Sequence, residues 1–215
     1  MAVKTPVVVP VPPAPAFEVF AISGFQSRMA AIRQEVRPWL LSVGEALAPV
    51  LAAQVGGPMF AHVALHARRT VNPPDDTWVA FGPSKRGYKK DRHFKVAISR
   101  SALRLLFEIG PEYPDKMAWA EAWRREGRSL RQGWSNTDLV WFRNEHDEEP
   151  AGPLAPLEVA DLAGMADRLL DRRDGQFVVG RRIERAQVLR LKEGAFGDLT
   201  LETFAALAPC FLLDS

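Results

Sequence analysis

The sequence has little cysteine, and this excludes a fold that depends on disulfides. Cys210 is its one cysteine, and a single cysteine cannot form an internal disulfide, so the fold does not need an oxidising compartment. Because Cys210 lies in an apolar stretch, residues 207–213, we expect it to be a small buried side chain rather than a nucleophile.

Long apolar runs are missing as well. No stretch of about 18 apolar residues occurs in the chain, so we expect no membrane span. The apolar residues between positions 7 and 16 are interrupted by four prolines, which is typical of an extended, solvated chain and not of a signal peptide. We therefore expect a cytoplasmic protein in which a flexible, proline-rich tail (residues 1–16) precedes a single domain (residues 17–215).

Charge is distributed unevenly along the chain. The formal net charge is only +2, but residues 61–100 hold nine lysines and arginines against three aspartates. Such an asymmetry says more about binding partners than about the fold. It predicts an anion-binding surface on this segment.

The order of the periodic patterns predicts an α+β fold. Apolar residues between 25 and 47 recur at alternating spacings of four and three, which indicates a helix that Pro38 interrupts and Gly56 ends. Alternation of apolar and polar residues then predicts strands at 60–69, 77–81, 93–99 and 103–109, with connections short enough for an antiparallel meander. Later patterns predict helices at 114–125, 157–171, 183–191 and 199–207, and strands at 137–143 and 175–182. We therefore expect a single domain with a mainly antiparallel central sheet, flanked by N-terminal and C-terminal helices.

Polar side chains are predicted to gather on one face of this sheet. Residues two apart in a strand share a face, so the polar residues of each strand point to one side, while the aliphatic residues point to the core. These polar residues are His62, His66 and Arg68, then His93 and Lys95, then Arg104 and Glu108. If the strands are neighbours in the sheet, their polar faces combine into one patch beside the loop 85–90.

The chemistry of this patch suits an anion. Arginine presents planar, paired donors to phosphate or carboxylate, Tyr88 and Trp78 can stack on a base or a ring, and Gly87 allows close approach of the backbone to a ligand. The loop has neither Walker spacing nor G-x-G-x-x-G, so it is not a standard phosphate-binding loop. The predicted binding residues are His62, His66, Arg68, Arg69, Trp78, Lys85, Arg86, Tyr88, Lys89, Lys90, His93 and Lys95.

Each of these residues also has a plainer interpretation. Lysines and arginines in loops are commonly solvated surface, and histidines such as His62 can be structural or can ligate a metal. Because no cysteine and no carboxylate at helical spacing lies near these histidines, we expect no metal site and no cofactor. Glu108 is either a general base or the ion-pair partner of Arg104 or Arg68. The candidate catalytic residues are His66, His93 and Glu108.

Two groups outside the basic segment have simple interpretations. His146 stands beside Asp147 and Glu148, which predicts a solvated acidic loop. The tryptophans at 119, 123 and 134 are expected in the core or an interface rather than at a ligand.

One stretch of the sequence resembles a known family. HVALHARRTVNPPDDTWVAF, followed by KRGYKKDRHFKVAI, resembles the signature of the YktB-like family, a bacterial group named as a domain of unknown function. ISGFQSRMAAIRQEVRPWL resembles the first helix of that family, and FVVGRRI and ETFAALAPCF resemble its last strand and closing helix. The resemblance implies a compact, cytosolic α+β domain of bacterial origin over about residues 17–213, and it assigns no catalytic role to any residue.

Three functions fit these observations. The first is binding of the DNA or RNA backbone, with the basic residues on phosphates and Tyr88 or Trp78 on bases. The second is an enzyme for a phosphorylated or carboxylated small molecule, with Arg68 and Arg69 as the anion clamp and His66, His93 or Glu108 as acid or base. The third is docking of the proline-rich tail on an aromatic groove of a partner. A hollow at the patch favours the second function, and an open surface favours the first.

Overall fold

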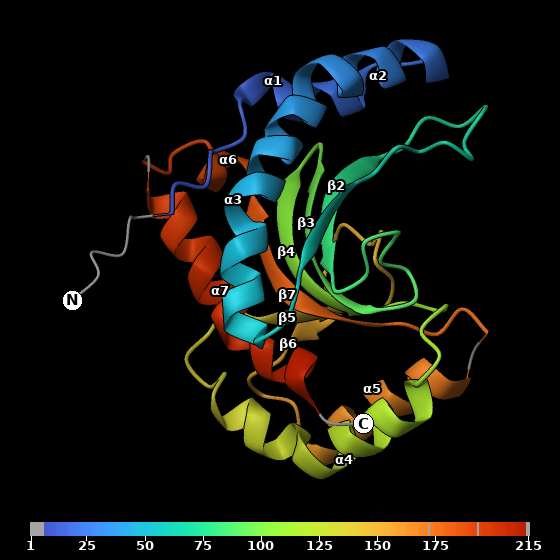
Figure 1. The fold of residues 1–215 in the computed structure, drawn as a ribbon, viewed down its shortest axis with the longest axis vertical. Helices are drawn as coiled ribbons and strands as arrows, with labels where there is room; N and C mark the ends of the chain where they lie inside the picture. The colour runs from blue at the N-terminus through green and yellow to red at the C-terminus, as the bar shows by residue number, and fades with distance from the viewer. Residues whose placement is uncertain (1–6, 172, 193, 214–215) are drawn as a thin grey trace.

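The computed structural model describes residues 7–171, 173–192 and 194–213, and it shows an α+β domain (Figure 1). Within these residues the strands are β1 (Phe60–Val63), β2 (Asp76–Gly82), β3 (Arg92–Ser99), β4 (Ala102–Ile109), β5 (Val140–Phe142), β6 (Gly152–Pro153) and β7 (Phe177–Glu184). The α-helices are α1 (Ala14–Glu18), α2 (Phe25–Ala31), α3 (Arg37–Val55), α4 (Lys116–Gln132), α5 (Val159–Asp171), α6 (Arg185–Val188) and α7 (Ala195–Leu212). A 3-10 turn, η1 (Val19–Ala21), and a π-helical turn, η2 (Ile32–Val36), complete the N-terminal part.

The strands form one sheet. Its order is β1-β2-β3-β4-β7-β5-β6, and every pairing is antiparallel. The predicted meander from β1 to β4 is present, and β7 returns from the C-terminal part to pair with β4. The predicted α+β class with a mainly antiparallel sheet is confirmed.

The N-terminal helix is interrupted where the sequence predicts it. The π-helical turn η2 stands directly before α3, and Pro38 lies in the first turn of α3. Because proline has no amide hydrogen, the backbone hydrogen-bond pattern cannot continue unchanged through this position. The helix then ends at Gly56, whose φ of 71° is in the left-handed region that favours glycine.

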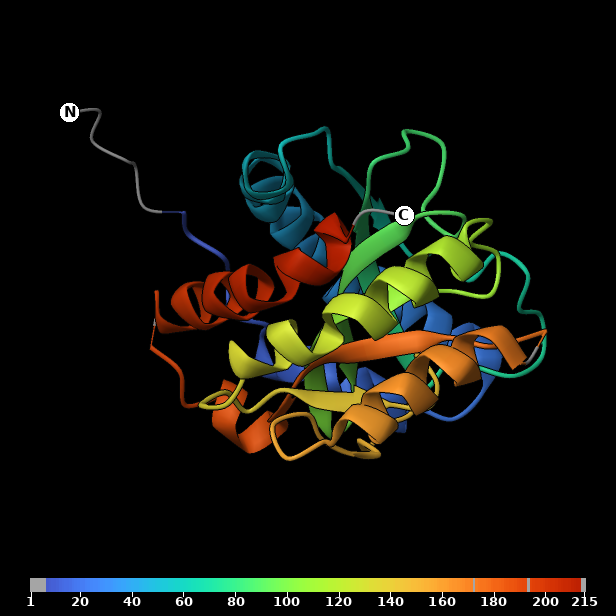
Figure 2. The ribbon, with the colours of Figure 1, turned by 90° about the horizontal axis from the view of Figure 1, so that it is seen from below.

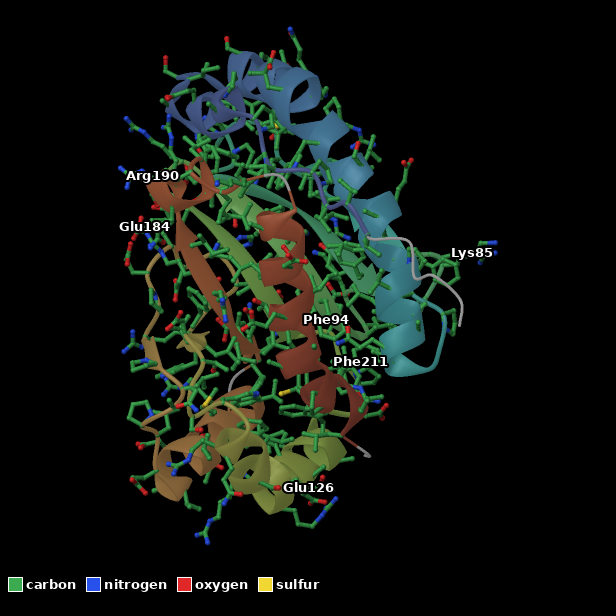
Figure 3. All side chains as sticks on the ribbon, turned by 90° about the vertical axis from the view of Figure 1, so that its left-hand side faces the viewer. Lys85, Phe94, Glu126, Glu184, Arg190 and Phe211 are labelled. Carbon is green, nitrogen blue, oxygen red and sulfur yellow. The ribbon has the colours of Figure 1, made fainter. Side chains whose placement is uncertain are left out.

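One face of the sheet carries the core. In Figures 1 and 2, α3 and α7 lie along this face, and α4 and α5 lie side by side at one end of the sheet. Phe94 of β3 stacks on Phe211 of α7 with ring centroids 5.4 Å apart, and Figure 3 labels both near the C-terminal end of this helix. Trp119, Trp123 and Trp134 are buried in the same core, as predicted.

The opposite face, which we call the polar face, is covered by the loops 83–91 and 143–151. Its residues are Asp76 and Trp78 of β2, His93 and Lys95 of β3, and Arg104 and Glu108 of β4. The register places them together, because His93 lies opposite Glu108 and Ala97 opposite Arg104. Period-two alternation therefore predicted the part of this face that β3 and β4 contribute.

The first predicted strand is shorter than expected. β1 ends at Val63, and residues 64–75 form a loop in which His66 has a φ of 51°. A left-handed residue turns the chain out of the strand. His66, Arg68 and Arg69 therefore do not continue the strand face of His62, and that part of the prediction is wrong.

The proline-rich segment also differs from the expected tail. Residues 1–6 lie outside the described residues. Residues 7–13 belong to no helix or strand, but Val9 is 1% exposed and Trp39 Nε1 donates a hydrogen bond to the Pro10 carbonyl at 2.8 Å. Residues 14–18 form α1, so the segment from Val9 onward packs against the domain.

Two helical stretches are long and apolar enough to cross a membrane by length and composition. They are Phe25–Val55 and Ala195–Leu212, each with a mean hydropathy of 1.3. Both bury apolar side chains in the core, for example Leu40 and Val43 in α3 and Phe204 and Leu207 in α7. Packing against the sheet accounts for this composition.

Candidate functional site

A buried lysine stands at the centre of the polar face. The Lys95 side chain is 0% exposed, and its Nζ lies 3.2 Å from Oε2 of Glu108. The same ammonium donates to Glu145, which reaches it from the loop 143–151, and it lies 4.3 Å from the centre of the Trp78 ring. Two carboxylates therefore share one buried ammonium.

A second ion pair lies beside it. The buried Arg104 donates through Nη2 to Asp76, and His146 Nδ1 donates to Asp76 Oδ1 at 3.1 Å. Through Nη1, Arg104 also donates to the carbonyls of Glu145 at 2.9 Å and Asp147 at 2.6 Å. These bonds hold the loop 143–151 against the sheet.

The pKa values show that this cluster is charged. Burial is the largest single effect and would raise the pKa of Glu108, but Lys95 and His93 together outweigh it and hold the pKa well below its usual value. Burial would lower the pKa of Lys95, but the carboxylates of Glu108 and Glu145 raise it. In the second pair, the hydrogen bond to Asp76 raises the pKa of His146, and His146 and Arg104 together lower the pKa of Asp76 against the effect of burial. Buried charges persist in proteins when they are paired in this way.

One ring nitrogen of His93 has no hydrogen-bond partner. Its Nδ1 donates to the Asp91 carbonyl at 2.9 Å. Its Nε2 lies 3.6 Å from Glu108 Oε2, which is too long for a hydrogen bond, and it is buried without a hydrogen-bond partner. Such a buried, unsatisfied polar atom in a native fold calls for an explanation.

A pocket of about 140 Å³ opens at this point. It is lined by Trp78, Tyr88, His93, Glu108, Glu145 and His146, and the exposed Lys89, Pro111 and Glu112 and the buried Gly110 complete it. Tyr88 accepts a hydrogen bond from Trp78 Nε1 at 2.7 Å, and burial raises the pKa of its phenol to about 12. The pocket therefore joins aromatic rings to a cluster of ionisable groups.

Similarity to known proteins extends over nearly the whole chain. The family described as Domain of unknown function (DUF1054) matches residues 14–211. A UPF0637 protein of Lysinibacillus sphaericus is 37% identical over 195 residues, which cover 91% of each chain. UPF0637 proteins of Bacillus licheniformis and Bacillus thuringiensis are each 34% identical, the first over 84% of each chain and the second over 92% of this chain and 94% of its own. The chain belongs to this family. The predicted membership in a bacterial family of unknown function is thus confirmed.

The structure separates the predicted binding residues of this DUF1054 domain into two groups. His93, Lys95 and Trp78 are buried at the pocket. The exposed cations lie on two loops at opposite ends of β2, with Arg68 and Arg69 before it and Lys85, Arg86, Lys89 and Lys90 after it (Figure 1). A strand of this length spans about 20 Å, so the predicted single basic patch is not formed.

The predicted histidines at the edge of the sheet have structural partners. His62 Nε2 lies 3.0 Å from the Ser84 carbonyl, and its ring lies 5.8 Å from Tyr88. His66 Nε2 lies 3.0 Å from the Thr77 hydroxyl, and burial lowers the pKa of His66 to about 4. His66 is therefore neutral at pH 7 and brings no positive charge to the surface.

Two sequence interpretations of the ionic groups need correction. Glu108 forms an ion pair, as one of the two alternatives held, but its partner is Lys95 and not Arg104 or Arg68. Lys95 and His93 do not lie on an exposed basic surface, because both are buried under the covering loops. Cys210 is buried as predicted, and burial raises the pKa of its thiol.

Sequence analysis missed three residues of the site. Asp76 stands at the end of a proline turn, and Glu145 and His146 stand in the stretch interpreted as a solvated acidic loop. A signal for them existed, because a lysine and an arginine on strands flanked by aliphatic residues require counter-ions when buried. Across the described parts of the chain, no group of three or more His, Cys, Asp or Glu side chains is arranged to hold a metal ion.

Proposed function

We propose that the protein binds a small molecule in the pocket of the polar face and acts on it with His93, which lies beside Glu108, as the acid–base group. The observation that carries this proposal is the burial of ionisable groups around a hollow: Lys95, Glu108 and His93 all lie at or below 2% exposure beside a pocket of about 140 Å³. A perturbed carboxylate with a specific partner in a cleft is a general mark of functional sites.

A purely structural role explains these charges less well. Taking an ion out of water costs several kcal/mol, and apolar residues of similar volume commonly stabilise a fold as well as a buried ion pair does. The core face of the same sheet is aliphatic and aromatic. Function at the pocket gives a reason for the charged groups on the polar face, whereas stability alone gives none.

The anion clamp expected from the sequence has no support at this pocket. Arg68 and Arg69 lie on the loop before β2, whereas Tyr88 and Lys89 of the pocket lie on the loop after it. Lys95, the cation beneath the pocket, is already shared by two carboxylates. Binding at this site therefore uses His93 and the carboxylates rather than an arginine pair.

Filling the pocket is expected to abolish small-molecule binding. Gly110 lines the pocket, and a Cβ added there would meet only the Lys89 carbonyl at 3.8 Å, so a leucine side chain has open space to enter. We expect a fragment library, screened by two-dimensional NMR of the whole chain, to yield compounds that shift the amides of Tyr88, His93 and Gly110. Those shifts should disappear in Gly110→Leu.

A matched control is available in α5. A Cβ at Gly164 would meet nothing within 4 Å, so this position also has room for a leucine side chain. Gly164→Leu is the same substitution as Gly110→Leu but lies outside the pocket, and it should leave fragment binding unchanged. Fragments that bind Gly110→Leu as well as the unaltered protein, or a library without any compound at these amides, would contradict the proposal.

A second candidate function is binding of a nucleic-acid backbone. One observation favours it: among the described residues, the six exposed cations of the loops 64–75 and 83–91 have no ion-pair partner. Figure 3 shows Lys85 projecting away from the body of the molecule. Unpaired, exposed ammonium and guanidinium groups are free to contact phosphates, which position a nucleic acid without reading its sequence.

Charge reversal on the loop 83–91 tests this candidate. Lys89→Glu combined with Lys90→Glu is expected to weaken binding of labelled single- and double-stranded DNA and RNA by roughly tenfold or more at low salt, because phosphate contacts are lost. Fluorescence anisotropy at low and moderate salt measures the affinity of each variant for each nucleic acid. Arg125→Glu with Arg128→Glu, on the exposed side of α4, carries the same charge change elsewhere and should bind normally. Absence of binding to all four nucleic acids at low salt rules the candidate out.

A further inference from the structure

We propose that a second pocket binds a small amphiphilic anion, with an apolar body of about one ring and one carboxylate or phosphate group that Arg33 and Arg37 hold. This pocket, which we call the edge pocket, lies between the N-terminal helices and the end of β1. It shares no lining residue with the pocket of the polar face, so the proposal goes beyond the proposed function and does not depend on it.

The interior of the edge pocket is apolar. Met29, Ile32 and Leu40 line it from the helices, and each is at most 3% exposed. Val63 at the end of β1 and Leu65 in the loop that follows line it from the sheet. Small-molecule sites commonly have such a lining, in which a few polar groups fix the orientation of the ligand.

Two arginines are the charged groups of this lining. Arg33 is exposed and Arg37 is half-buried, and neither forms an ion pair within the part of the chain that the structure describes. The hydroxyl of Thr77, which also lines the pocket, already has a partner in His66 Nε2 at 3.0 Å. The two guanidinium groups are therefore the polar groups left free for a ligand.

Carboxylates near the edge pocket do not neutralise these arginines. The lining itself, all of which the structure describes, contains no Asp or Glu. Glu35 is two positions from each arginine, and residues two apart on a helix do not face each other. Asp75 and Asp76 stand just before Thr77 in the chain, but they pair with Arg28 and Arg104. The charge at the pocket therefore favours an anion, and guanidinium groups offer paired donors to carboxylate or phosphate.

The π-helical turn η2 is a separate observation that points to the same place. Here the amide of Arg37 donates to the carbonyl of Ile32, five positions back instead of four, and both of these residues line the edge pocket. Turns of this kind are rare and occur frequently at functional sites. The irregular turn and the unpaired arginines thus coincide at one pocket.

The volume limits the size of the ligand. A cavity of about 150 Å³ holds one benzene molecule, and the edge pocket measures about 200 Å³. Leu40 in the interior is fully buried, whereas Arg33 is exposed to water. A ring fits the apolar interior, and its anionic group then reaches the guanidinium groups.

Benzoate and benzamidine give a matched test, because they share size and shape and differ in charge. With the whole ¹⁵N-labelled chain, we expect benzoate to shift the amides of Ile32, Ala64 and Leu65 in a saturable way, and benzamidine to bind there at least tenfold more weakly. Inorganic phosphate, which has no apolar body, should also bind at least tenfold more weakly than benzoate. Phenyl phosphate identifies the head group, since the tighter of phenyl phosphate and benzoate names it.

Variants of the two arginines test how the anion is held. Arg33→Gln should weaken benzoate about two- to fivefold, as loss of one exposed charge partner does, and its exposed position protects the fold. Arg33→Gln combined with Arg37→Gln should abolish the preference for benzoate over benzamidine. Arg128→Gln, on the exposed side of α4, is the control and should change neither affinity.

Three results would overturn the inference. Benzamidine that binds at these amides as tightly as benzoate would reject the anion class. Unchanged benzoate affinity in the double variant would reject the arginines as its partners. If none of the four compounds shifts the amides of the edge pocket, the site itself is rejected. The proposed function is judged separately in the same spectra, by the amides of Tyr88, His93 and Gly110.

Discussion

Replacing Lys95 by methionine is expected to lower the free energy of unfolding by about 3–5 kcal/mol, as loss of one partner from a buried ion pair does. Methionine keeps most of the volume of the side chain but removes the ammonium that Glu108 and Glu145 share. Glu108 is 2% exposed, so its carboxylate would remain buried without a counter-ion. Urea unfolding at pH 7 measures the change.

The pH dependence of this variant should be the reverse of that of the unaltered protein. The folded-state pKa of Glu108 is depressed, so its stabilisation is present above the unfolded-state pKa and is lost as pH falls. Without Lys95, burial raises that pKa instead, and Lys95→Met should gain stability as pH falls from 7 to 5. Lys95→Met with Glu108→Gln should recover part of the loss at pH 7.

Lys90→Met is the control for this series. Lys90 is exposed and lies outside the cluster, so its substitution should change stability by no more than about 0.5 kcal/mol. An effect of Lys95→Met as small as that of Lys90→Met would show that the buried cluster is not charged as described.

Replacing Gly180 by alanine is expected to destabilise the sheet by about 3 kcal/mol or more, at the upper end of overpacking effects. An added Cβ would lie 2.0 Å from the Leu105 carbonyl oxygen and 2.8 Å from the Leu106 Cα, and both neighbours are backbone atoms of β4. β7 would have to move away from β4. Because Gly180 also pairs with Val140 of β5, the strand that leads into the covering loop 143–151 would move with it.

Urea unfolding and amide hydrogen exchange of residues 143–148 measure this effect together. Gly164→Ala in α5 is the control, since its Cβ meets nothing within 4 Å and alanine favours a helix by about 1 kcal/mol over glycine. A Gly180→Ala protein as stable as the unaltered one, with unchanged exchange in the loop, would show that the strands do not approach each other this closely.

Local patterns in the sequence predicted the sheet well. The alternation at 93–99 and 103–109 placed His93 with Lys95 and Arg104 with Glu108, and the register brings these residues onto one face. The same reasoning failed at 60–69, where alternation continues in the sequence but the backbone leaves the strand after Val63. A left-handed residue at His66 is a backbone choice that alternation of side chains does not reveal.

Charge in the sequence was a poorer guide than periodicity. Lys89, Lys90 and Lys95 are chemically identical and close in the chain, yet Lys89 and Lys90 are exposed while Lys95 is fully buried. The number of lysines and arginines in residues 61–100 predicted one basic surface. Burial of Lys95 against carboxylates leaves two separate groups of exposed cations instead, and the pocket beside it is lined by carboxylates together with Lys89 and His146.

The sequence by itself determined the α+β class, the strands β3 and β4 and the polar residues that share their face, because side-chain direction alternates with every residue of a strand and this is a local property. Only the tertiary structure decided that Lys95 and Arg104 are buried and neutralised. Glu145 lies 50 positions after Lys95, and Asp76 lies 28 positions before Arg104. The loop that closes over a face is chosen by long-range packing and hydrogen bonds, and no nearby residues encode that choice.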